Sequence, residues 1–258
     1  MKFASLGSGS EGNALLISAT SGMTCTTVML DCGFSVKETE RRLARAGLAA
    51  SDIGGIVITH EHSDHVSGAF KFARRHRVPV WLSHGTFQAV QADCKDVDIR
   101  FCRDGDALAI GDLELTPYTV PHDAREPVQY VAQDGQSRLG VLTDAGHLTS
   151  HLVNALAGCH ALVLECNHDS QLLATSVYPP SLKRRIGGAY GHLSNDSSTL
   201  ILQAIDKTRL RRVVGAHLSQ QNNTPELAAA AIALGLAGAD AEISVAGQSD
   251  GFGWIEME

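Results

Sequence analysis

The sequence predicts an α/β protein with four layers, in which two sheets are packed between two layers of helices. Short apolar or β-branched runs at 2–6, 14–18 and 26–31 are typical of strands separated by Gly and Ser turns. Strand-like runs return from 97 to 143, and helical segments follow each strand group. Because every sheet and helix must bury an apolar face, an αββα sandwich covers all of these segments.

Each helix prediction rests on a local signal. Ser35 and Glu38 have the spacing of a capping box, which predicts a helix with Val36, Leu43 and Ala46 on one side. Further helices are expected at 65–75, 148–156, 182–186, 194–205 and 225–236. Later strands are expected at 55–59, 79–83, 107–110, 113–120, 128–132, 138–143, 161–165, 212–216, 241–244 and 252–256. The middle strands follow one another like a meander, so a doubly wound parallel sheet fits less well.

Length and composition indicate one ordinary globular domain, 1–258. Hydrophobic residues make up 44% of the chain and charged residues 19%, a balance that excludes a disordered protein. The net charge of −7 argues against broad attraction to nucleic acid or anionic membranes, although it leaves room for a local basic patch. The longest apolar window is shorter than the roughly 20 residues of a bilayer span, so we expect no membrane contact.

The six cysteines include no C-x-x-C pair, and the amino terminus lacks the apolar run of a signal peptide. Free thiols in a reducing cytoplasm are therefore the simplest interpretation. Nothing in the sequence indicates an oligomeric state.

The central functional signal is the segment HEHSDH, directly after the apolar run GIVIT. Residues two apart in an extended chain project to one side, so His60 and His62 are expected to converge on one ion. After a turn, Asp64 and His65 can reach a second ion, since imidazole and carboxylate are common ligands of divalent metals. A chance match to this spacing is on the order of 10⁻³, which makes a polar surface turn the weaker interpretation.

Two ions need further ligands, because each site takes about four groups with one exchangeable water. Three later apolar strands are followed by a suitable residue, namely His122, Asp144 and His217. Any one of them alone is more often an ordinary loop residue. After the HEHSDH segment, however, the three together predict a two-metal site at the strand ends.

With these residues in place, VITHEHSDHVSG resembles the signature of the metallo-β-lactamase superfamily, whose members are αββα sandwiches. The resemblance implies two ligand sets, one of His60, His62 and His122, the other of Asp64, His65 and His217, with Asp144 bridging. Asp31 matches a structural aspartate behind the ligands and is not counted as one. Its plainer interpretation is a turn residue at a strand end.

Four further stretches, SLGSGSEGN, LECNHD, YPPSLKRRIGGAYGHLSN and AHLSQQNN, resemble the YycJ (WalJ) group of bacterial nucleases. The last two also resemble the late histidine motifs of tRNA-processing and RNA-degrading nucleases of this fold. The resemblance implies a metal-dependent phosphodiester hydrolase, and a role in DNA repair. SLGSGSEGN lacks the GK[ST] ending of a phosphate loop, so we expect a turn near the site entrance.

Local positive charge supports a phosphodiester substrate. One cluster, Lys183, Arg184 and Arg185, precedes His192, and a second, Arg209, Arg211 and Arg212, precedes His217. Contacts to a phosphate backbone require such cations, although a solvated helix face is the alternative for both clusters. Ser194 and Asn195 are expected to cap the next helix, whose amino end can also bind a phosphate.

We predict two catalytic residues. Asp64 orients the attacking water or accepts its proton, and His192 contacts the scissile phosphate or assists the leaving oxygen. His168 is a weaker candidate, for which a place behind the site or on the surface is at least as fitting. Cys32 and Cys166 are expected to be buried packing thiols.

The predicted function is that of a DNA exonuclease acting from 5′ ends with two divalent ions, Zn or Mn, with Fe also compatible. DNA is preferred over RNA as the partner. The alternative is a small-molecule hydrolase of the same fold that acts on a thioester or lactam. A non-catalytic metal-binding protein is a third hypothesis, which the complete ligand set disfavours.

Overall fold

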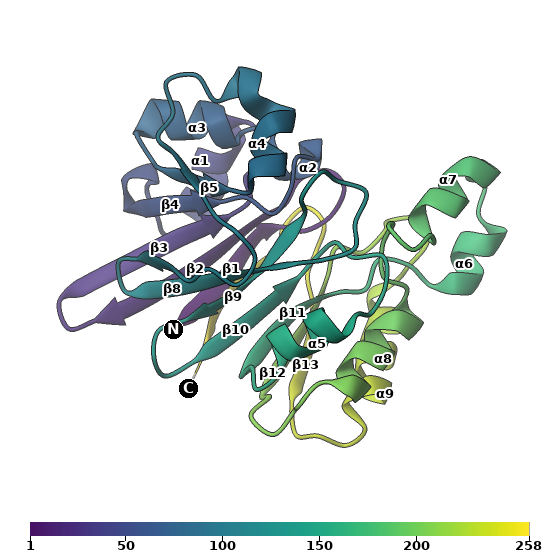
Figure 1. Ribbon diagram of the computed structural model, residues 1–258. Helices are drawn as coiled ribbons and strands as arrows, with labels where there is room; N and C mark the ends of the chain where they lie inside the picture. The colour runs from purple at the N-terminus through teal and green to yellow at the C-terminus, as the bar shows by residue number, and fades with distance from the viewer. Residues whose placement is uncertain (258) are drawn as a thin grey trace.

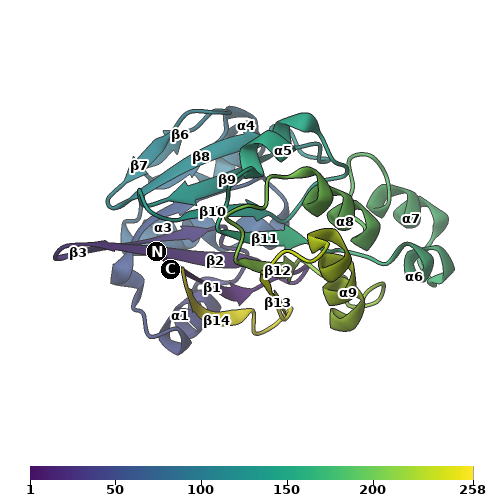
Figure 2. The same ribbon diagram turned by 90° about the horizontal axis from the view of Figure 1, so that it is seen from below.

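Two seven-stranded sheets face each other in the middle of the molecule, and helices cover the outer side of each (Figure 1, Figure 2). This computed structural model describes residues 1–257. The four layers confirm the predicted αββα sandwich. The two halves of the chain contribute one sheet each, except that the last strand returns to the edge of the first sheet.

The first sheet has the order β14-β1-β2-β3-β4-β5-β6. Its strands are β1 (Lys2–Gly7), β2 (Ala14–Ser21), β3 (Thr24–Leu30), β4 (Ile53–Val57), β5 (Val80–Leu82), β6 (Ile99–Phe101) and β14 (Phe252–Glu256). The pairs from β3 to β6 are parallel, and the others are antiparallel. The helices of this half are α1 (Val36–Arg45), α2 (Ser63–Val66), α3 (Ala69–His76) and α4 (His84–Val90), with short 3₁₀ turns η1 (Ala50–Asp52) and η2 (Gln91–Asp93).

The second sheet has the order β13-β12-β11-β10-β9-β8-β7. Its strands are β7 (Leu108–Ile110), β8 (Leu113–Thr119), β9 (Val128–Gln133), β10 (Arg138–Leu142), β11 (Ala161–Glu165), β12 (Arg212–Ala216) and β13 (Glu242–Val245). Strands β7 to β10 form the predicted antiparallel meander, and β10 to β13 are parallel. The helices are α5 (Ser150–Leu156), α6 (Ser170–Thr175), α7 (Pro180–Ile186), α8 (Asn195–Ala204) and α9 (Pro225–Leu236).

The strands are apolar on both faces because both faces are covered. Ile17 and Val28 point into the core between the two sheets, whereas Leu16 and Met29, their neighbours in sequence, pack toward the helices. Successive side chains of a strand point to opposite faces, so one strand contributes to two cores. This explains why the early strands are continuous apolar runs and do not alternate with polar residues.

Local signals placed some helix boundaries well and missed others. The side chain of Ser35 caps α1 by accepting a hydrogen bond from the backbone N–H of Glu38, as predicted. The single helix expected at 65–75 is instead two helices, α2 and α3, that meet at Gly68. A Cβ atom there would lie 1.7 Å from the carbonyl oxygen of Phe34, so only glycine allows this approach. Helices α4 and α6 were not predicted.

Most of the cysteines are buried side chains. All six are free in the structure, and Cys32 and Cys166 are fully buried, as predicted for packing thiols. Among residues 1–257, no helix is both long and apolar enough to cross a membrane.

Gly33 lies in the loop between β3 and α1 and packs closely against the backbone of α2 at Asp64. A Cβ atom at Gly33 would lie 1.8 Å from the carbonyl oxygen of Asp64, so the backbone must move if the glycine is replaced. We expect Gly33→Ala to lower the free energy of unfolding by about 1–3 kcal/mol, as measured by urea denaturation. Gly54→Ala is the matched control, because its nearest neighbour would be 3.6 Å away. Equal stability of the two variants would contradict this close approach.

Candidate metal centre

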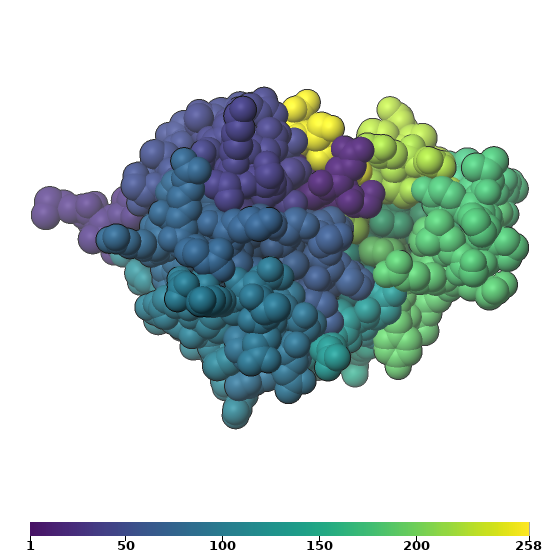
Figure 3. All heavy atoms as spheres, turned by 90° about the horizontal axis from the view of Figure 1, so that it is seen from above, coloured from purple at the N-terminus to yellow at the C-terminus, as the bar shows by residue number. Residues whose placement is uncertain are grey.

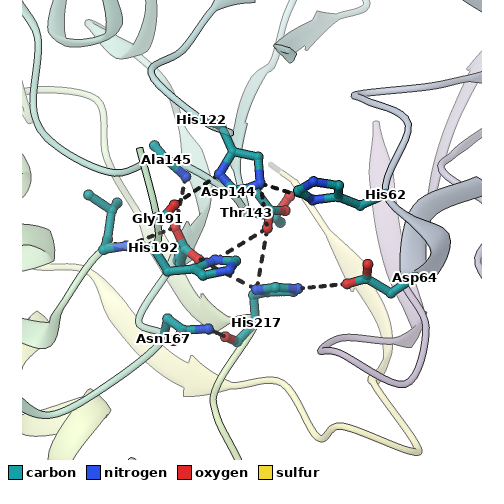
Figure 4. Close-up of polar contacts among 12 residues, drawn as sticks. His62, Asp64, His122, Thr143, Asp144, Ala145, Asn167, Gly191, His192 and His217 are labelled. Atoms are coloured by element: carbon teal, nitrogen blue, oxygen red, sulfur yellow. Dashed lines mark hydrogen bonds and ion pairs between the residues drawn. The ribbon is translucent and has the colours of Figure 1, made fainter. Parts of the chain in front are cut away.

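The candidate site lies where strands from both sheets end. Strands β3, β4, β8, β10, β11 and β12 all direct their carboxyl ends to the same edge of the sandwich. Each is followed within a few residues by an ionisable side chain, as β8 is by His122 and β12 by His217. In Figure 4 the side chains of His62, Asp64, His122, Asp144 and His217 point toward one another from these separate segments.

The seven residues predicted as ligands come together in overlapping groups. One group is His60, His62 and His122, and another is Asp64, His65 and His217. Within each group, atoms able to bind a metal lie within 4.8 Å of one another. Asp144 lies between the groups: its Oδ1 is 4.0 Å from Nε2 of His122 in the first, and its Oδ2 is 3.3 Å from Nε2 of His65 in the second.

Three buried atoms in this cluster show that it fits a divalent cation. Nε2 of His60, Oδ2 of Asp144 and Nδ1 of His217 have no hydrogen-bond partner among residues 1–257. Buried polar atoms are almost always paired, because an unpaired one costs about 1–3 kcal/mol. All three belong to the ligand groups, where a metal ion would provide the missing partner. The donor set of imidazoles and carboxylates suits a divalent metal.

Hydrogen bonds behind the cluster fix the orientation of its rings. Nδ1 of His65 donates to Oδ2 of Asp31 over 2.7 Å, which leaves Nε2 facing Asp144. Asp31 also accepts hydrogen bonds from the backbone N–H and the hydroxyl of Thr59, at 2.8 and 2.9 Å. Nδ1 of His122 donates to the carbonyl oxygen of Gly191 over 2.9 Å. Such partners select the tautomer that presents the other nitrogen to a metal.

The surroundings lower the pKa of some histidines of the site and raise that of others. Burial lowers the pKa of His60 and of His122, so both are neutral at pH 7 and ready to bind a metal. Burial opposes the charged form of His217 as well, but attraction to Asp144 and Glu165 and a hydrogen bond to Asp64 raise its pKa to about 10. Burial also opposes the charged form of His65, but nearby carboxylates raise its pKa.

Glu165 belongs to the site and was missed as a site residue. It is fully buried, and its Oε1 lies 2.8 Å from Nδ1 of His192 and 3.4 Å from Nδ1 of His217. Its Oε2 accepts hydrogen bonds from the backbone N–H groups of Ala145 and Leu193. Burial opposes ionisation, but the two histidines lower the pKa of Glu165 to about 2. The signal was present, because Glu165 ends an apolar strand as Asp144 follows one.

The second predicted basic cluster lies at the start of β12, at the opposite end of this strand from the site. Arg212 is the first residue of β12 and pairs with Glu242, whereas His217 follows the other end of that strand. A strand rises about 3.3 Å per residue, so the length of β12 separates Arg212 from His217 by roughly 16 Å. The expectation that the cluster at 209–212 contacts substrate phosphate beside the site is therefore wrong.

The three basic residues of the cluster on α7 have different surroundings. Arg185 lines the cleft beside the metal centre, and its Nε donates to Oδ2 of Asp123 over 2.6 Å. Lys183 instead donates to the carbonyl oxygen of Ala174 and ties α7 to α6. Arg184 is exposed and, among residues 1–257, is not one of those that line the cleft.

The remaining predicted residues serve the scaffold. Ser194 caps α8 by accepting a hydrogen bond from the backbone N–H of Ser197, as expected. The amide of Asn195 is buried and paired with the side chain of Asn223, so it does not reach a substrate. His168 is 3% exposed and does not line the cleft within the described chain, which agrees with the alternative of a place behind the site.

The cleft at the metal centre has a volume of about 350 Å³. Its lining residues are Ser10, His62, Ser63, Asp64, Asp144, Asn167, Tyr178, Leu182, Arg185, Ile186, His192, His217, Leu218 and Ser219. The space-filling view shows the green region of α6 and α7 beside purple and blue residues from the first half of the chain, with the surface hollowed between them (Figure 3). Ser10 lies in the SLGSGSEGN turn, so that turn does border the entrance.

Comparison with known proteins agrees with this geometry. The β-lactamase superfamily domain matches residues 26–218. Exodeoxyribonuclease YycJ of Bacillus anthracis is 35% identical over 231 residues, which cover 88% of this chain and 86% of the relative. Exodeoxyribonuclease WalJ of Streptococcus pneumoniae is 28% identical over 249 residues, covering 95% and 91%.

Solved structures share the fold. Zinc-bound PqqB from Methylobacterium extorquens superposes with a TM-score of 0.76 at 16% identity, covering 99% of this chain and 100% of the other. YhfI from Bacillus subtilis gives a TM-score of 0.71 at 15% identity and covers 99% of both chains. Both similarities extend over the whole sandwich.

Metal binding should release protons. The pKa values of His65 and His217 are raised, so both rings are protonated at pH 7. A metal binds only to a deprotonated ring nitrogen, so each ring must lose a proton when the metal binds. Metal affinity is therefore expected to rise as the pH increases from 6 to 8. Calorimetric titration with Zn²⁺ in buffers of different ionisation enthalpy measures the released protons. A binding enthalpy that is the same in every buffer would contradict the prediction.

Asp31 should support metal binding without touching the ion. Asp31→Asn weakens its hydrogen bond to His65, and we expect metal affinity to fall about 10- to 100-fold in chelator competition. Asp98→Asn is the control, because Asp98 forms only an exposed pair with Arg100. Thermal unfolding of both variants checks that the fold is intact. Unchanged affinity in a folded Asp31→Asn protein would show that this carboxylate is dispensable.

Proposed function

Because this chain belongs to the β-lactamase superfamily, we propose that it is a metal-dependent phosphodiesterase, and specifically a DNA exonuclease that acts from 5′ ends. One observation supports this function above all: the ligand groups open into a polar cleft that also holds Arg185 and His192. In phosphodiester hydrolysis a metal centre can activate water, and a nearby cation can bind the charge of the phosphate. The relatives named exodeoxyribonuclease cover most of this chain, which supports DNA as the substrate.

We assign the centre two divalent ions, Zn or Mn, with Fe also compatible. His60, His62 and His122 would hold one ion, Asp64, His65 and His217 the other, and Asp144 would bind both. When bound, such ions lower the pKa of coordinated water and stabilise charge on the attacking and leaving oxygens.

We assign the proton transfers to one ligand, Asp64, and to His192 beside the ligands. Asp64 lines the cleft, and its Oδ2 lies 3.4 Å from Nε2 of His217 and accepts a hydrogen bond from Asn13. It is placed to orient the attacking water and to accept its proton. Glu165 accepts a hydrogen bond from Nδ1 of His192. Nε2 of that ring is therefore the nitrogen that donates a proton to the leaving oxygen. The pKa of His192 is raised because attraction to Glu165 outweighs its burial, which keeps the ring protonated.

The alternative of a thioesterase has weaker support. Hydroxyacylglutathione hydrolase of Rhodopseudomonas palustris is 28% identical over 82 residues, only 32% of this chain. An arginine at the cleft also suits an anionic phosphodiester better than a neutral thioester. We further assign the protein to the cytoplasm, since its free thiols suit a reducing compartment.

The proposed activity is tested on end-blocked DNA with Mn²⁺ or Zn²⁺. We expect a single-stranded oligonucleotide blocked at its 3′ end to be degraded, and one blocked at its 5′ end to resist. Asp64→Ala should abolish the activity, since it removes both a ligand and the proton acceptor. Hydrolysis of a thioester without cleavage of DNA would overturn the proposal. Degradation that requires a free 3′ end would overturn the polarity alone.

His192→Ala should separate proton transfer from metal binding. We expect kcat to fall about 10²- to 10⁴-fold, the usual contribution of a general acid, while metal content stays near that of the unchanged protein. The control is His147→Ala, because His147 is exposed on a neighbouring loop and contacts the carbonyl oxygen of Ala189. If both variants kept full kcat, the assignment of His192 as the general acid would be wrong.

A further inference from the structure

One wall of the cleft is apolar and aromatic, although the opposite residues are charged. Leu182, Arg185 and Ile186 are three and four positions apart, so they share one face of α7. Tyr178 lies just before the helix, and all four side chains line the cleft. Figures 1 and 2 show α6 and α7 projecting together beyond the second sheet. The cleft therefore joins a metal centre to an apolar wall with one arginine in it.

Arg185 provides positive charge close to the metal ligands. Among residues 1–257 it is the only arginine or lysine that lines the cleft. Its side chain is 59% exposed while it pairs with Asp123, so part of the guanidinium stays open to the solvent. Oδ1 of Asp123 lies 3.6 Å from Nε2 of His62 and 3.5 Å from Nε2 of His122. One carboxylate thus links Arg185 to the metal centre.

The wall is held at a fixed position relative to that centre. The backbone N–H of His192 donates to the carbonyl oxygen of Ile186, at the end of α7. The carbonyl oxygen of Gly191 accepts the hydrogen bond from Nδ1 of His122. A Cβ atom on Gly191 would lie 2.1 Å from the carbonyl oxygen of Arg185, so only glycine lets these segments approach. A group bound to α7 is therefore positioned against the metal ligands.

From this arrangement we infer that the cleft binds one unpaired terminal nucleotide, with its base against Tyr178, Leu182 and Ile186 and its phosphate on Arg185. This inference rests on the proposed nuclease function and names the form of substrate that the site takes. A flat base stacks on an aromatic ring, and a guanidinium binds a phosphate in a two-point contact. The volume of about 350 Å³ suits one nucleotide and is too small for a base pair with its neighbours.

A base that binds this wall must lie outside the base stack of a duplex. A base inside a duplex is stacked between its neighbours and cannot present its face to Tyr178. The terminal base must therefore leave the stack, which costs less at a single-stranded or mismatched end. The protein is expected to release the first nucleotide faster from such ends than from a blunt, paired end.

The test compares two single-stranded oligonucleotides, one with a natural 5′-terminal nucleotide and one with an abasic residue at the same position. With the unchanged protein, kcat/KM for release of the first unit should be about 10- to 100-fold higher for the natural end, as expected for base stacking. Tyr178→Ala should remove this preference and leave the abasic end unchanged. Tyr178→Phe should keep it, because the ring remains. Tyr190→Ala is the matched control, since Tyr190 is 63% exposed near α7 and does not line the cleft.

A second pair of variants tests the phosphate contact. Arg185→Gln should raise KM for the natural and abasic ends alike, because both carry the phosphate. Arg184→Gln should leave both unchanged, since its side chain lies outside the cleft. The two pairs thus separate recognition of the base from recognition of the phosphate.

The outcomes distinguish this inference from the function on which it rests. Equal rates on natural and abasic ends, or an equal loss on both in Tyr178→Ala, would contradict the contact between the base and Tyr178. DNA cleavage itself would not be affected by either result. Failure of the unchanged protein to cleave any oligonucleotide with Mn²⁺ or Zn²⁺ would overturn the nuclease function, and this inference with it. A preference for blunt, paired ends would also contradict the unpaired nucleotide.

Discussion

The structure depends on a cluster of carboxylates and imidazoles buried where the strands of both sheets end. Asp31, Asp144 and Glu165 are each at most 1% exposed, and they lie beside histidines that are nearly as buried. Removing ionised groups from water is expensive unless partners compensate for the lost hydration. The imidazoles compensate for part of this cost, and the unpartnered atoms of His60, Asp144 and His217 show where a cation belongs.

The shape of the sandwich makes this cluster possible. Strands from both sheets point their carboxyl ends to one edge, so residues from position 31 to position 217 meet there although they are distant in sequence. The loops at that edge are held by close backbone contacts, such as Gly33 against Asp64 and Gly68 against Phe34. The backbone N–H of His217, which has a φ of 54°, donates to the side chain of Ser8 in the first glycine-rich turn. The glycine-rich turn after β1 thus helps to anchor His217 at the site.

The order of apolar segments was enough to predict the two sheets and the helical layers, because most elements, though not α4 and α6, show their buried face in their sequence. The HEHSDH segment identified the site for a similar reason: its spacing follows directly from strand and turn geometry. What could not be predicted were relations through space. The cluster at 209–212 looked equivalent to the one at 183–185, since sequence distance does not show that β12 carries it to the far edge. Glu165 was passed over because one carboxylate after a strand is ambiguous until its neighbours are known.

The central claim is that these distant side chains converge on metal ions, and anomalous diffraction tests it most directly. Crystals of the protein grown with Zn²⁺ or Mn²⁺ would be measured on both sides of the absorption edge of the metal. The account predicts two anomalous peaks, one among His60, His62 and His122 and one among Asp64, His65 and His217, with Asp144 in contact with both. Peaks elsewhere on the protein, or none in a crystal shown to contain the metal, would contradict it.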